Sequence, residues 1–565
     1  MSYLVKQTRG QLADAIQDAA QKAAACGDLP HVPTAPFQVE SPADSTNGDF
    51  SANAAMVWAK ELRMSPRKIA EAICVRIALD GATIDRCEVA GAGFLNFYCS
   101  DAYFAAILLD VNEKGECYGR SNFGQGKRVN VEYVSANPTG PMHLGNARGG
   151  ALGDCLSAVL QAAGYDVTRE FYVNDAGSQI RKLAISLDVR YQQIFLGAQA
   201  PELPTECYQG ADIVALAREF AKTHGEGFLQ KPEWERREAL IAYALPKNIA
   251  QMKKTLDGYR IHYDVWFSES TLHENGEIAR VIALLKEKGL TYERDGALWY
   301  KVAEDGADKD EVLIRESGFP SYFAADIAYH CNKLATRGFD HAINIWGADH
   351  HGHVARMQGV LDALGLDGSH RLEIILIQLV RLVSGGEVVR MSKRSGKAIT
   401  LEVLLDEIPV DAARFFFNMR DPSTQMEFDL DLAVQETAQN PVYYCQYAHA
   451  RICSIFRKLQ EEGVVLRGAS AEDLRLLTAP EERTLIRLLA SLTDEIIRAA
   501  ESRDPARITR YCMGLSAAYH KFYAVCPVKS VDDSLMQARL CLCAAVRGVL
   551  KNLLGMFKIT VPEQM

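Results

Sequence analysis

The 565-residue sequence has no long apolar run and no paired cysteine motif. None of its apolar stretches approaches the roughly 20 residues that span a bilayer. The first ten residues already contain Lys and Arg and have no apolar core, which does not fit a secretory signal. The 14 cysteines include no Cys-x-x-Cys, and the nearest two are Cys541 and Cys543. These absences argue against a disulfide framework and a four-cysteine zinc site, so we expect reduced thiols, a cytoplasmic location and no membrane partner.

The overall charge of −10 does not favour nucleic-acid binding, but the charge is unevenly distributed. Residues 441–565 carry 17 Lys and Arg against 13 Asp and Glu, while the remainder of the chain is acidic. A mildly basic C-terminal unit on an acidic body is compatible with RNA contact. A chance fluctuation of charge explains the same numbers, so both interpretations stay open.

The length predicts three or four domains. Residues 1–108 are predicted to form an α+β domain, because helical patterns precede two strand-like runs, Cys87–Ala90 and Gly93–Tyr98. Residues 401–440 read as a stem. Residues 441–565 show only helix-face spacing, as in Leu485, Leu489, Leu492 and Ile496, and predict an all-α bundle.

Residues 121–400 alternate short apolar strands with helices, which predicts an α/β, doubly wound, Rossmann-like parallel sheet. A mostly helical, polar segment at about 181–256 interrupts this pattern and reads as an insertion. The strands are predicted at Val129–Val134, Thr168–Val173, Ala297–Val302 and Ala342–Trp346.

The stretch His143-Leu144-Gly145-Asn146 follows a predicted strand and a breaker-rich turn and leads into a helix. A helix start presents free backbone N–H groups and a positive dipole end to an anion. His143 and Asn146 can donate to a phosphate, and a flat ring can pack on the bare backbone of Gly145. The alternative is a turn with a capping Asn.

The stretch Met391-Ser392-Lys393-Arg394-Ser395-Gly396 is a loop with several cations, including Arg390 just before it. A mobile lysine such as Lys393 can stabilise charge that develops on a pyrophosphate leaving group. The alternative is a solvated basic loop.

Together these stretches resemble the HIGH and KMSKS motifs of class I aminoacyl-tRNA synthetases. Within that class the chain resembles the arginyl-tRNA synthetase family over essentially its whole length. The segments that carry the resemblance are Val131–Gly140, Asn174–Gly177, Ser321–Ile327 and Asp411–Phe416. Asn146 replaces the last His of HIGH, so a protonated imidazole is excluded there. Arg390 replaces the first Lys of KMSKS and keeps its charge.

The resemblance implies roles for the motif residues. Some family members lack the loop lysine and carry one just before HIGH. Here Lys393 is present and Thr139–Met142 contains no lysine, so the two features agree. The implied catalytic residues are His143, Asn146 and Lys393. The implied ATP-binding residues are His143, Gly145, Asn146, Arg390, Met391, Ser392 and Lys393.

The resemblance also implies an arginine pocket. A guanidinium is planar, always charged and offers five donors, so it needs acceptors in fixed geometry. Tyr322 and Asp326 are four apart and share one face if their segment is helical; the alternative is a helix start with a surface acid. The crowded histidines of Asp349–His353 invite a metal interpretation, but we expect no structural metal and place His350 near the substrate. The implied arginine-binding residues are Glu132, Asn137, Tyr322, Asp326 and His350.

Two regions are predicted to contact tRNA. Aromatic side chains stack on unpaired bases and arginine pairs with phosphate. The resemblance makes residues 441–565 an anticodon-binding domain and matches Phe94 and Asn96 to positions that read the tRNA D-loop. The alternatives are tyrosines that pack a bundle core and an ordinary edge strand. The predicted C-terminal contacts are Tyr443, Tyr447, His449 and Arg451.

We therefore predict an arginine–tRNA ligase that uses ATP with Mg²⁺ to form arginyl-adenylate and transfers the arginyl group to the 3′ end of tRNA(Arg). AMP and pyrophosphate leave. The resemblance implies that tRNA is needed for activation, and that the enzyme is a monomer without an obligate protein partner. Two alternatives are a related nucleotidyltransferase and a non-catalytic RNA-binding paralogue.

Overall fold

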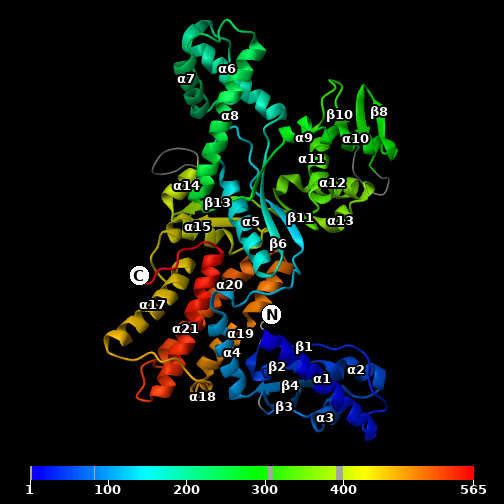
Figure 1. Cartoon of the computed structure of the whole chain (residues 1–565), viewed down its shortest axis with the longest axis vertical. Coiled ribbons are helices and arrows are strands. Elements are labelled where there is room, and N and C mark those ends of the chain that lie inside the picture. Colours follow the sequence, from blue (N-terminus) through cyan, green and yellow to red (C-terminus); the bar gives the residue numbers. More distant parts are fainter. Residues whose placement is uncertain (1–2, 43, 82, 303–309, 390–398) are drawn as a thin grey trace.

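The structure is a computed structural model that describes residues 3–42, 44–81, 83–302, 310–389 and 399–565. A helical projection lies at one end of the molecule, the central sheet lies in the middle, and an N-terminal unit and a helical bundle lie side by side at the other end (Figure 1). No helix in the described ranges is long and apolar enough to cross a membrane.

The N-terminal unit packs helices against an antiparallel sheet of order β1-β2-β4-β3. Its third helix begins with Pro66 in the first turn, where the missing N–H costs nothing, and buries Ile69, Ala70 and Ile73. The elements are α1 (Tyr3–Ala25), β1 (Val39–Glu40), η1 (Ser45–Asn47), β2 (Phe50–Ala52), α2 (Ala54–Leu62), α3 (Pro66–Cys74), β3 (Ile84–Ala90), β4 (Phe94–Cys99), α4 (Asp101–Lys114) and η2 (Gly115–Cys117).

The central sheet contains five parallel strands in the order β12-β11-β5-β6-β7. The first of these five strands in the sequence, β5, therefore lies in the middle of the sheet. The chain adds later strands on either side of it, and the winding direction reverses between β5 and β11. Ligands of doubly wound folds bind at the carboxyl ends of the strands at this reversal. The predicted fold class is confirmed. The strands are β5 (Arg128–Glu132), β6 (Asp166–Val173), β7 (Val265–Ser268), β11 (His341–Gly347) and β12 (Leu372–Ile377).

Helix α5 (Leu144–Ala162) follows β5 in the sequence and packs tightly against Tyr133, the residue directly after β5. A Cβ at Gly153 would lie only 2.2 Å from Cγ of Tyr133, so no larger residue fits there without displacing the ring. This close approach aims the N-terminal end of α5 toward the carboxyl ends of the strands.

The strand predicted at Ala297–Val302 does not belong to the parallel sheet. It is β9 (Ala297–Tyr300), the middle strand of a separate antiparallel sheet with β8 (Thr291–Arg294) and β10 (Glu311–Ile314). Asp295 and Gly296 form the two-residue turn between β8 and β9, both with positive φ (51° and 72°). An Asp-Gly pair favours this kind of hairpin turn, which joins antiparallel strands.

The segment after β6 forms the helical projection of Figure 1. It has its own apolar cluster, which includes Leu187, Tyr191, Phe220 and Leu240. Its elements are α6 (Gly177–Leu196), η3 (Gly197–Gln199), α7 (Ala211–His224) and α8 (Glu233–Gly258).

The other elements of the central region cover the sheet or lead to the bundle. They are α9 (Ser270–Glu274), α10 (Glu277–Glu287), α11 (Tyr322–Cys331), the π-helix η4 (Asn332–Thr336), η5 (Ala348–His350), α12 (His351–Ala363), α13 (Gly368–Arg371), β13 (Val380–Ser384), β14 (Glu387–Val389), α14 (Leu401–Glu407), α15 (Val410–Phe417), β15 (Met426–Asp429) and α16 (Leu430–Ala433).

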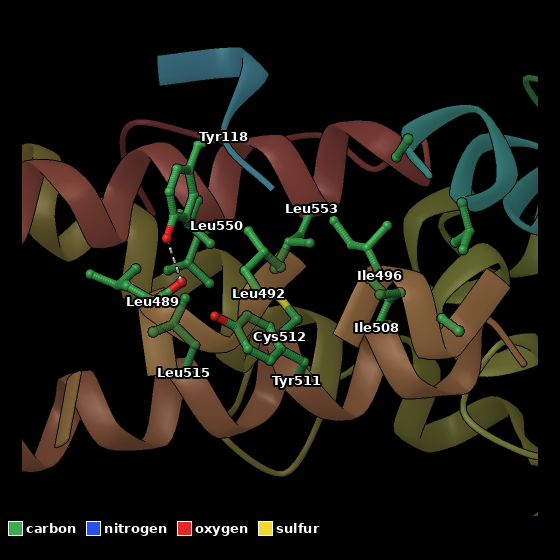
Figure 2. Packing of buried hydrophobic residues seen from close by; sticks show 14 of the residues in the cluster. Tyr118, Leu489, Leu492, Ile496, Ile508, Tyr511, Cys512, Leu515, Leu550 and Leu553 are labelled. Atoms are coloured by element: carbon green, nitrogen blue, oxygen red, sulfur yellow. Dashed lines mark hydrogen bonds between the residues drawn. The ribbon is translucent and has the colours of Figure 1, made fainter. Parts of the chain in front are cut away.

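The C-terminal region is helical: α17 (Pro441–Glu461), α18 (Ala471–Leu474), α19 (Pro480–Glu501), α20 (Ala506–Val525) and α21 (Asp533–Met556). Figure 2 shows leucine and isoleucine side chains of α19, α20 and α21 meeting in a buried layer. Tyr118, from the connector after α4, enters this layer and donates from its hydroxyl to the carbonyl of Leu489 at 2.9 Å. The connector is thereby fastened to the bundle.

Ion pairs join α5 to α15 and to the segment that follows α21. Arg414 on α15 and Asp154 on α5 form a salt bridge with neither side chain exposed. Arg414 also donates to the carbonyls of Phe557 (2.6 Å) and Tyr259 (3.0 Å), and Lys558 lies 2.9 Å from Asp154. Burial alone would raise the pKa of Asp154, but the charges of Arg414 and Lys558 outweigh it and hold that pKa below its ordinary value.

Candidate active site

The turn before α5 exposes polar groups at a helix start. His143 is the exposed N-cap residue, and its backbone N–H donates to Oδ1 of Asn146 at 2.8 Å. This bond leaves the amide nitrogen of Asn146 as the group that can contact a ligand. A Cβ on Gly145 would meet no described atom within 4 Å, so the space beside its backbone is open to a flat ring.

A cavity of about 530 Å³ lies beside this turn. Asn137, His143 and Asn146 line it from the α5 side, and the helical projection contributes Tyr208, Gln209, Gly210, Asp212 and Ile213. The projection therefore completes the site rather than only packing against itself. Three predicted residues share the cavity, whereas Tyr322 and Asp326 are not among its lining residues.

The second predicted motif lies across residues 390–398, so Arg390, Met391, Ser392 and Lys393 are outside the described residues. The chain on both sides of it is next to the start of α5. Thr400 forms a β-bridge with His143, and the N–H of Leu401 donates to the carbonyl of Met142 at 2.9 Å. A second cavity, about 640 Å³, is lined by Leu144 together with Val389 and Ile399. The ends of this segment and the His143 turn thus border one region.

Glu132, predicted to bind arginine, ends β5 and is only 6% exposed. Nζ of Lys333 lies 2.6 Å from its Oε2, and the hydroxyl of Ser135 donates to its Oε1 at 3.0 Å. Both carboxylate oxygens therefore already accept a hydrogen bond. Each oxygen keeps further acceptor capacity, so a ligand donor can still bind.

Tyr322 and Asp326 lie on one face of α11, as their spacing predicts. The Tyr322 hydroxyl meets the N-terminal end of α6, where it accepts from the N–H of Ser178 at 3.3 Å. Oδ2 of Asp326 lies 3.1 Å from Nε2 of His353. His350 is exposed and lies beside Asp349 and Trp346. Within the predicted histidine-rich segment, His353 rather than His350 therefore contacts Asp326.

Glu269 is a site residue that sequence reasoning missed. It directly follows β7 and is 3% exposed. Burial raises its pKa to about 7, and the charges of Asp326 and Asp175 contribute. With its nitrogen turned toward acceptors, the Asn174 amide donates to Glu269 at 3.0 Å and lies 3.3 Å from the Asn137 side chain. The only signal for Glu269 was its position directly after a strand. Site residues also follow β5, β6 and β11 at the same edge of the sheet.

This arrangement places two kinds of group at one edge. The start of α5 provides hydrogen-bond donors for an anion, and the ends of the neighbouring strands provide carboxylates for a cation. Across the part of the chain that the structure describes, no group of three or more His, Cys, Asp or Glu side chains could hold a metal ion.

Comparisons with known proteins agree with this geometry. The family model "tRNA synthetases class I (R), catalytic domain" matches residues 108–455. Models of an arginyl-tRNA synthetase N-terminal domain and a DALR anticodon-binding domain match residues 10–99 and 445–565. The chain belongs to the arginyl-tRNA synthetase family.

Relatives of this family match along the whole chain. The arginine–tRNA ligase of Caldanaerobacter subterraneus subsp. tengcongensis is 51% identical over 565 residues, with both chains fully covered. That of Ruminiclostridium cellulolyticum is 47% identical with the same coverage. The arginyl-tRNA synthetase structure from Thermus thermophilus shares the fold at 22% identity, with a TM-score of 0.73 over 98% of this chain and 100% of that one. The predicted enzyme class, an aminoacyl-tRNA ligase with ATP as a substrate, is confirmed.

The family's N-terminal domain contains a separate cavity of about 360 Å³. Phe94, 40% exposed, and Asn96, 3% exposed, both line it from β4. The hydroxyl of Ser51 donates to Oδ1 of Asn96 at 2.8 Å, which fixes the amide orientation. The two residues predicted to contact tRNA are thus brought together around a hollow.

In the DALR region, the predicted aromatic residues of α17 meet side chains of α20. Tyr443 and Tyr447 stack with ring centroids 6.3 Å apart, and Tyr447 stacks on His520 at 5.9 Å. Arg451 lies over the ring of Tyr523 at 4.1 Å. His520 and Tyr523 carry no motif, and the sequence did not predict these contacts.

His449 is less accessible than the other predicted tRNA contacts of α17. It was predicted to contact tRNA, but it is 4% exposed and its Nδ1 lies 2.9 Å from the carbonyl of Pro562. Tyr447 and His449 are two apart, so a helix turns them to different faces. His449 therefore fastens the C-terminal tail to α17.

Proposed function

We propose that this chain joins L-arginine to the 3′ end of tRNA(Arg) in two steps, with ATP entering as its Mg²⁺ complex. The carboxylate of arginine attacks the α-phosphate of ATP, so that arginyl-adenylate forms and pyrophosphate leaves. A ribose hydroxyl of the terminal nucleotide then takes the arginyl group and AMP leaves. The observation that carries this proposal is the pairing of phosphate donors at the start of α5 with carboxylates at the ends of the strands.

The donors have the ATP role in this proposal. His143 and the amide nitrogen of Asn146 hold phosphate oxygens, and adenine packs beside Gly145. Arg390, Met391, Ser392 and Lys393 close over ATP from the opposite side. The adjacency of Thr400 to His143 supports this assignment. The groups act by positioning and charge stabilisation, without a covalent enzyme intermediate.

The carboxylates have the arginine role. Asp326 takes the guanidinium, since its carboxylate suits a two-pronged donor, and Tyr322 covers one side. Glu132, Asn137 and His350 complete the predicted set. The carboxyl groups of Asp175, Glu269 and Asp326 make this part of the site acidic. An acidic site favours arginine over a neutral amino acid. A lysine substrate would lose the forked geometry, which gives discrimination.

The N-terminal and C-terminal domains bind tRNA in this proposal. Residues 1–108 bind the tRNA D-loop through Phe94 and Asn96, and residues 441–565 bind the anticodon through Tyr443, Tyr447 and Arg451. The catalytic domain is 121–400, with the insertion at 181–256 and the stem at 401–440. The hollow at Phe94 and the stacked rings of α17 support these assignments. A monomer in the cytoplasm, with no membrane or obligate protein partner, completes the proposal.

Arginine-dependent ATP–pyrophosphate exchange, with and without tRNA(Arg), tests this function. We expect exchange that requires arginine and tRNA together. Asp326→Ala should raise the KM for arginine by about 10- to 100-fold, because a hydrogen bond to a charged group is worth roughly 1.5–3 kcal/mol. The matched control is Asp349→Ala, whose side chain is 80% exposed. Absence of arginine-dependent exchange under all conditions would refute the function, and an unchanged KM would refute the role of Asp326.

A further inference from the structure

Three buried polar residues form a row across the central sheet. Asn344 on β11 is in register with Glu132 on β5, which is in register with Glu170 on β6. Asn344 and Glu170 are fully buried, and Glu132 nearly so. A buried carboxylate is costly unless it is paired and hydrogen-bonded, so the partners of this row matter.

The partners come from one short π-helix, η4, and the residue that follows it. Nζ of Lys333, which is fully buried, lies 2.6 Å from Oε2 of Glu132 and 3.0 Å from Oδ1 of Asn344. Arg337 donates to Oε1 of Glu170 at 2.9 Å. A π-helix is rare and commonly marks a functional site. Here η4 and the residue after it bring two cations to carboxylates of two neighbouring strands, β5 and β6.

The donors and acceptors of this network have only one consistent arrangement. A lysine ammonium can only donate, so Asn344 must turn its oxygen toward Lys333 and its NH₂ toward His330. Nδ2 of Asn344 lies 2.7 Å from Nε2 of His330, which must accept. The proton of His330 is then on Nδ1, which donates to the carbonyl of Asp326 at 2.7 Å. Burial, together with the charge of Lys333, lowers the pKa of His330 to about 3 and keeps the ring neutral.

The contacts of Lys333 therefore reach both sides of the arginine pocket. One hydrogen bond holds Glu132 at the end of β5, and a relay of three holds the backbone of Asp326 on α11. We propose that Lys333 is the positioning residue of this pocket, which fixes Glu132 and Asp326 relative to one another without touching the substrate. The inference rests on the proposed function, in which these two carboxylates bind arginine.

The neighbouring pair, Arg337 with Glu170, provides a matched control. It is also an ion pair with a fully buried carboxylate, although Arg337 itself is 22% exposed, and it lies one strand farther along. Glu170 accepts from Arg337 and from the Tyr329 hydroxyl, and neither contact leads to a predicted arginine ligand. If Lys333 only stabilised the fold, loss of either cation would have the same effect on substrate binding.

The test compares Lys333→Met with Arg337→Met in arginine-dependent exchange. We expect Lys333→Met to raise the KM for arginine by about 10- to 100-fold, as a displacement near 1 Å can do, with the KM for ATP changed less than about threefold. Arg337→Met should change both constants less than about threefold, while both variants lose thermal stability. Equal increases in arginine KM for the two variants would overturn the proposal.

Two further measurements cover loss of folding. The double variant Glu132→Gln/Lys333→Met removes the carboxylate that Lys333→Met leaves without its cation, so it should melt at a higher temperature than Lys333→Met yet keep a raised arginine KM. In the folded wild type, nitrogen chemical shifts should place the His330 proton on Nδ1, and Lys333→Met should shift population to Nε2. An unchanged tautomer together with an unchanged arginine KM would refute positioning by Lys333. Normal wild-type exchange in the same experiment separates that result from failure of the proposed function.

Discussion

Two sets of polar and charged side chains near α5 differ in burial and in what they contact. Asp154, in the middle of the helix, is fully buried and pairs with Arg414 and Lys558. His143, at the start of the helix, is exposed beside a cavity, and Asp326 across the site is one-third exposed. The first set closes its hydrogen bonds within the protein, whereas the second keeps capacity for a ligand. Charge alone therefore does not indicate function. A polar group indicates function when it keeps free hydrogen-bonding capacity beside a cavity.

The difference also explains how one helix has two roles. Asp154 ties α5 to Arg414 on α15 and to Lys558 after α21, which restrains the helix. His143 and Asn146 are then held in fixed positions at the other end. Preorganised groups stabilise developing charge without moving, which is the main electrostatic contribution that proteins make to catalysis.

The largest expected effect is on stability, from breaking the buried set. Asp154→Ala leaves Arg414 buried without its carboxylate, so we expect a loss of about 3–5 kcal/mol in the free energy of unfolding. Urea denaturation measures this, with the exposed Asp349→Ala as control. At a temperature where the variant is folded, the KM for arginine should stay within about threefold. A loss under about 1 kcal/mol would show that burial does not distinguish the two sets.

The next effect is on activity, from removing an exposed group. His143→Ala should lower kcat/KM in exchange by about 100- to 1,000-fold, roughly 3–4 kcal/mol of transition-state stabilisation. Unfolding should change by less than about 1 kcal/mol, since the side chain faces the cavity. His351→Ala, also exposed, is the control. Activity near that of the wild type would remove His143 from the ATP site.

Glu269 lies between the two sets, because it is buried yet lies among like charges. Its pKa is raised to about 7 from 4.5 in the folded protein. The unfolded chain therefore loses this proton first as pH rises. The stabilising contribution is complete below pH 4.5 and is lost through pH 7, on the order of 3 kcal/mol.

Glu269→Gln should remove this pH dependence. Denaturation of both proteins from pH 4 to pH 8.5 should give a difference in unfolding free energy that grows in favour of the variant up to about pH 7 and then levels. Parallel curves for the two proteins would mean that Glu269 titrates normally. Saturating arginine should reduce the difference, since a bound cation favours the ionised carboxylate.

The smallest expected effect is on tRNA binding, at an exposed residue far from the cavity. Tyr447→Ala should raise the KM for tRNA by about 5- to 30-fold, which corresponds to one stacked base at roughly 1–2 kcal/mol. The KM values for arginine and ATP should not change. Val531→Ala, exposed on the same bundle, is the control. An unchanged KM for tRNA would assign the rings of α17 to structure alone.

Much of the fold and part of the site could be predicted from local sequence. Strand-like runs, breakers and helix-face spacing depend on neighbouring residues, so the alternation from Val129 to Leu401 indicated a parallel sheet. The motif at His143 predicted a helix start because turn and cap signals are local. Ala297–Tyr300 was assigned to the wrong sheet, because a strand pattern does not say which neighbour pairs with it.

The roles of other residues could not be predicted from the sequence, because they depend on contacts that only folding creates. Lys333 and Glu132 are 201 positions apart, and only folding brings them into contact. His449 looked like an RNA ligand because it stands among tyrosines in sequence, whereas the helix turns it inward. Glu269 carries no motif, and its role follows from the strand end on which it stands.

The sequence by itself determined the family, the order of the domains and the residues of the two motifs, because these depend on residue type and local spacing. Only the tertiary structure decided which charged groups are satisfied and which remain available. It pairs Asp154 with Arg414, Glu132 with Lys333 and Asp326 with His353. The physical reason is that a charge's contribution depends on its burial and partners, and both are set by contacts between distant parts of the chain.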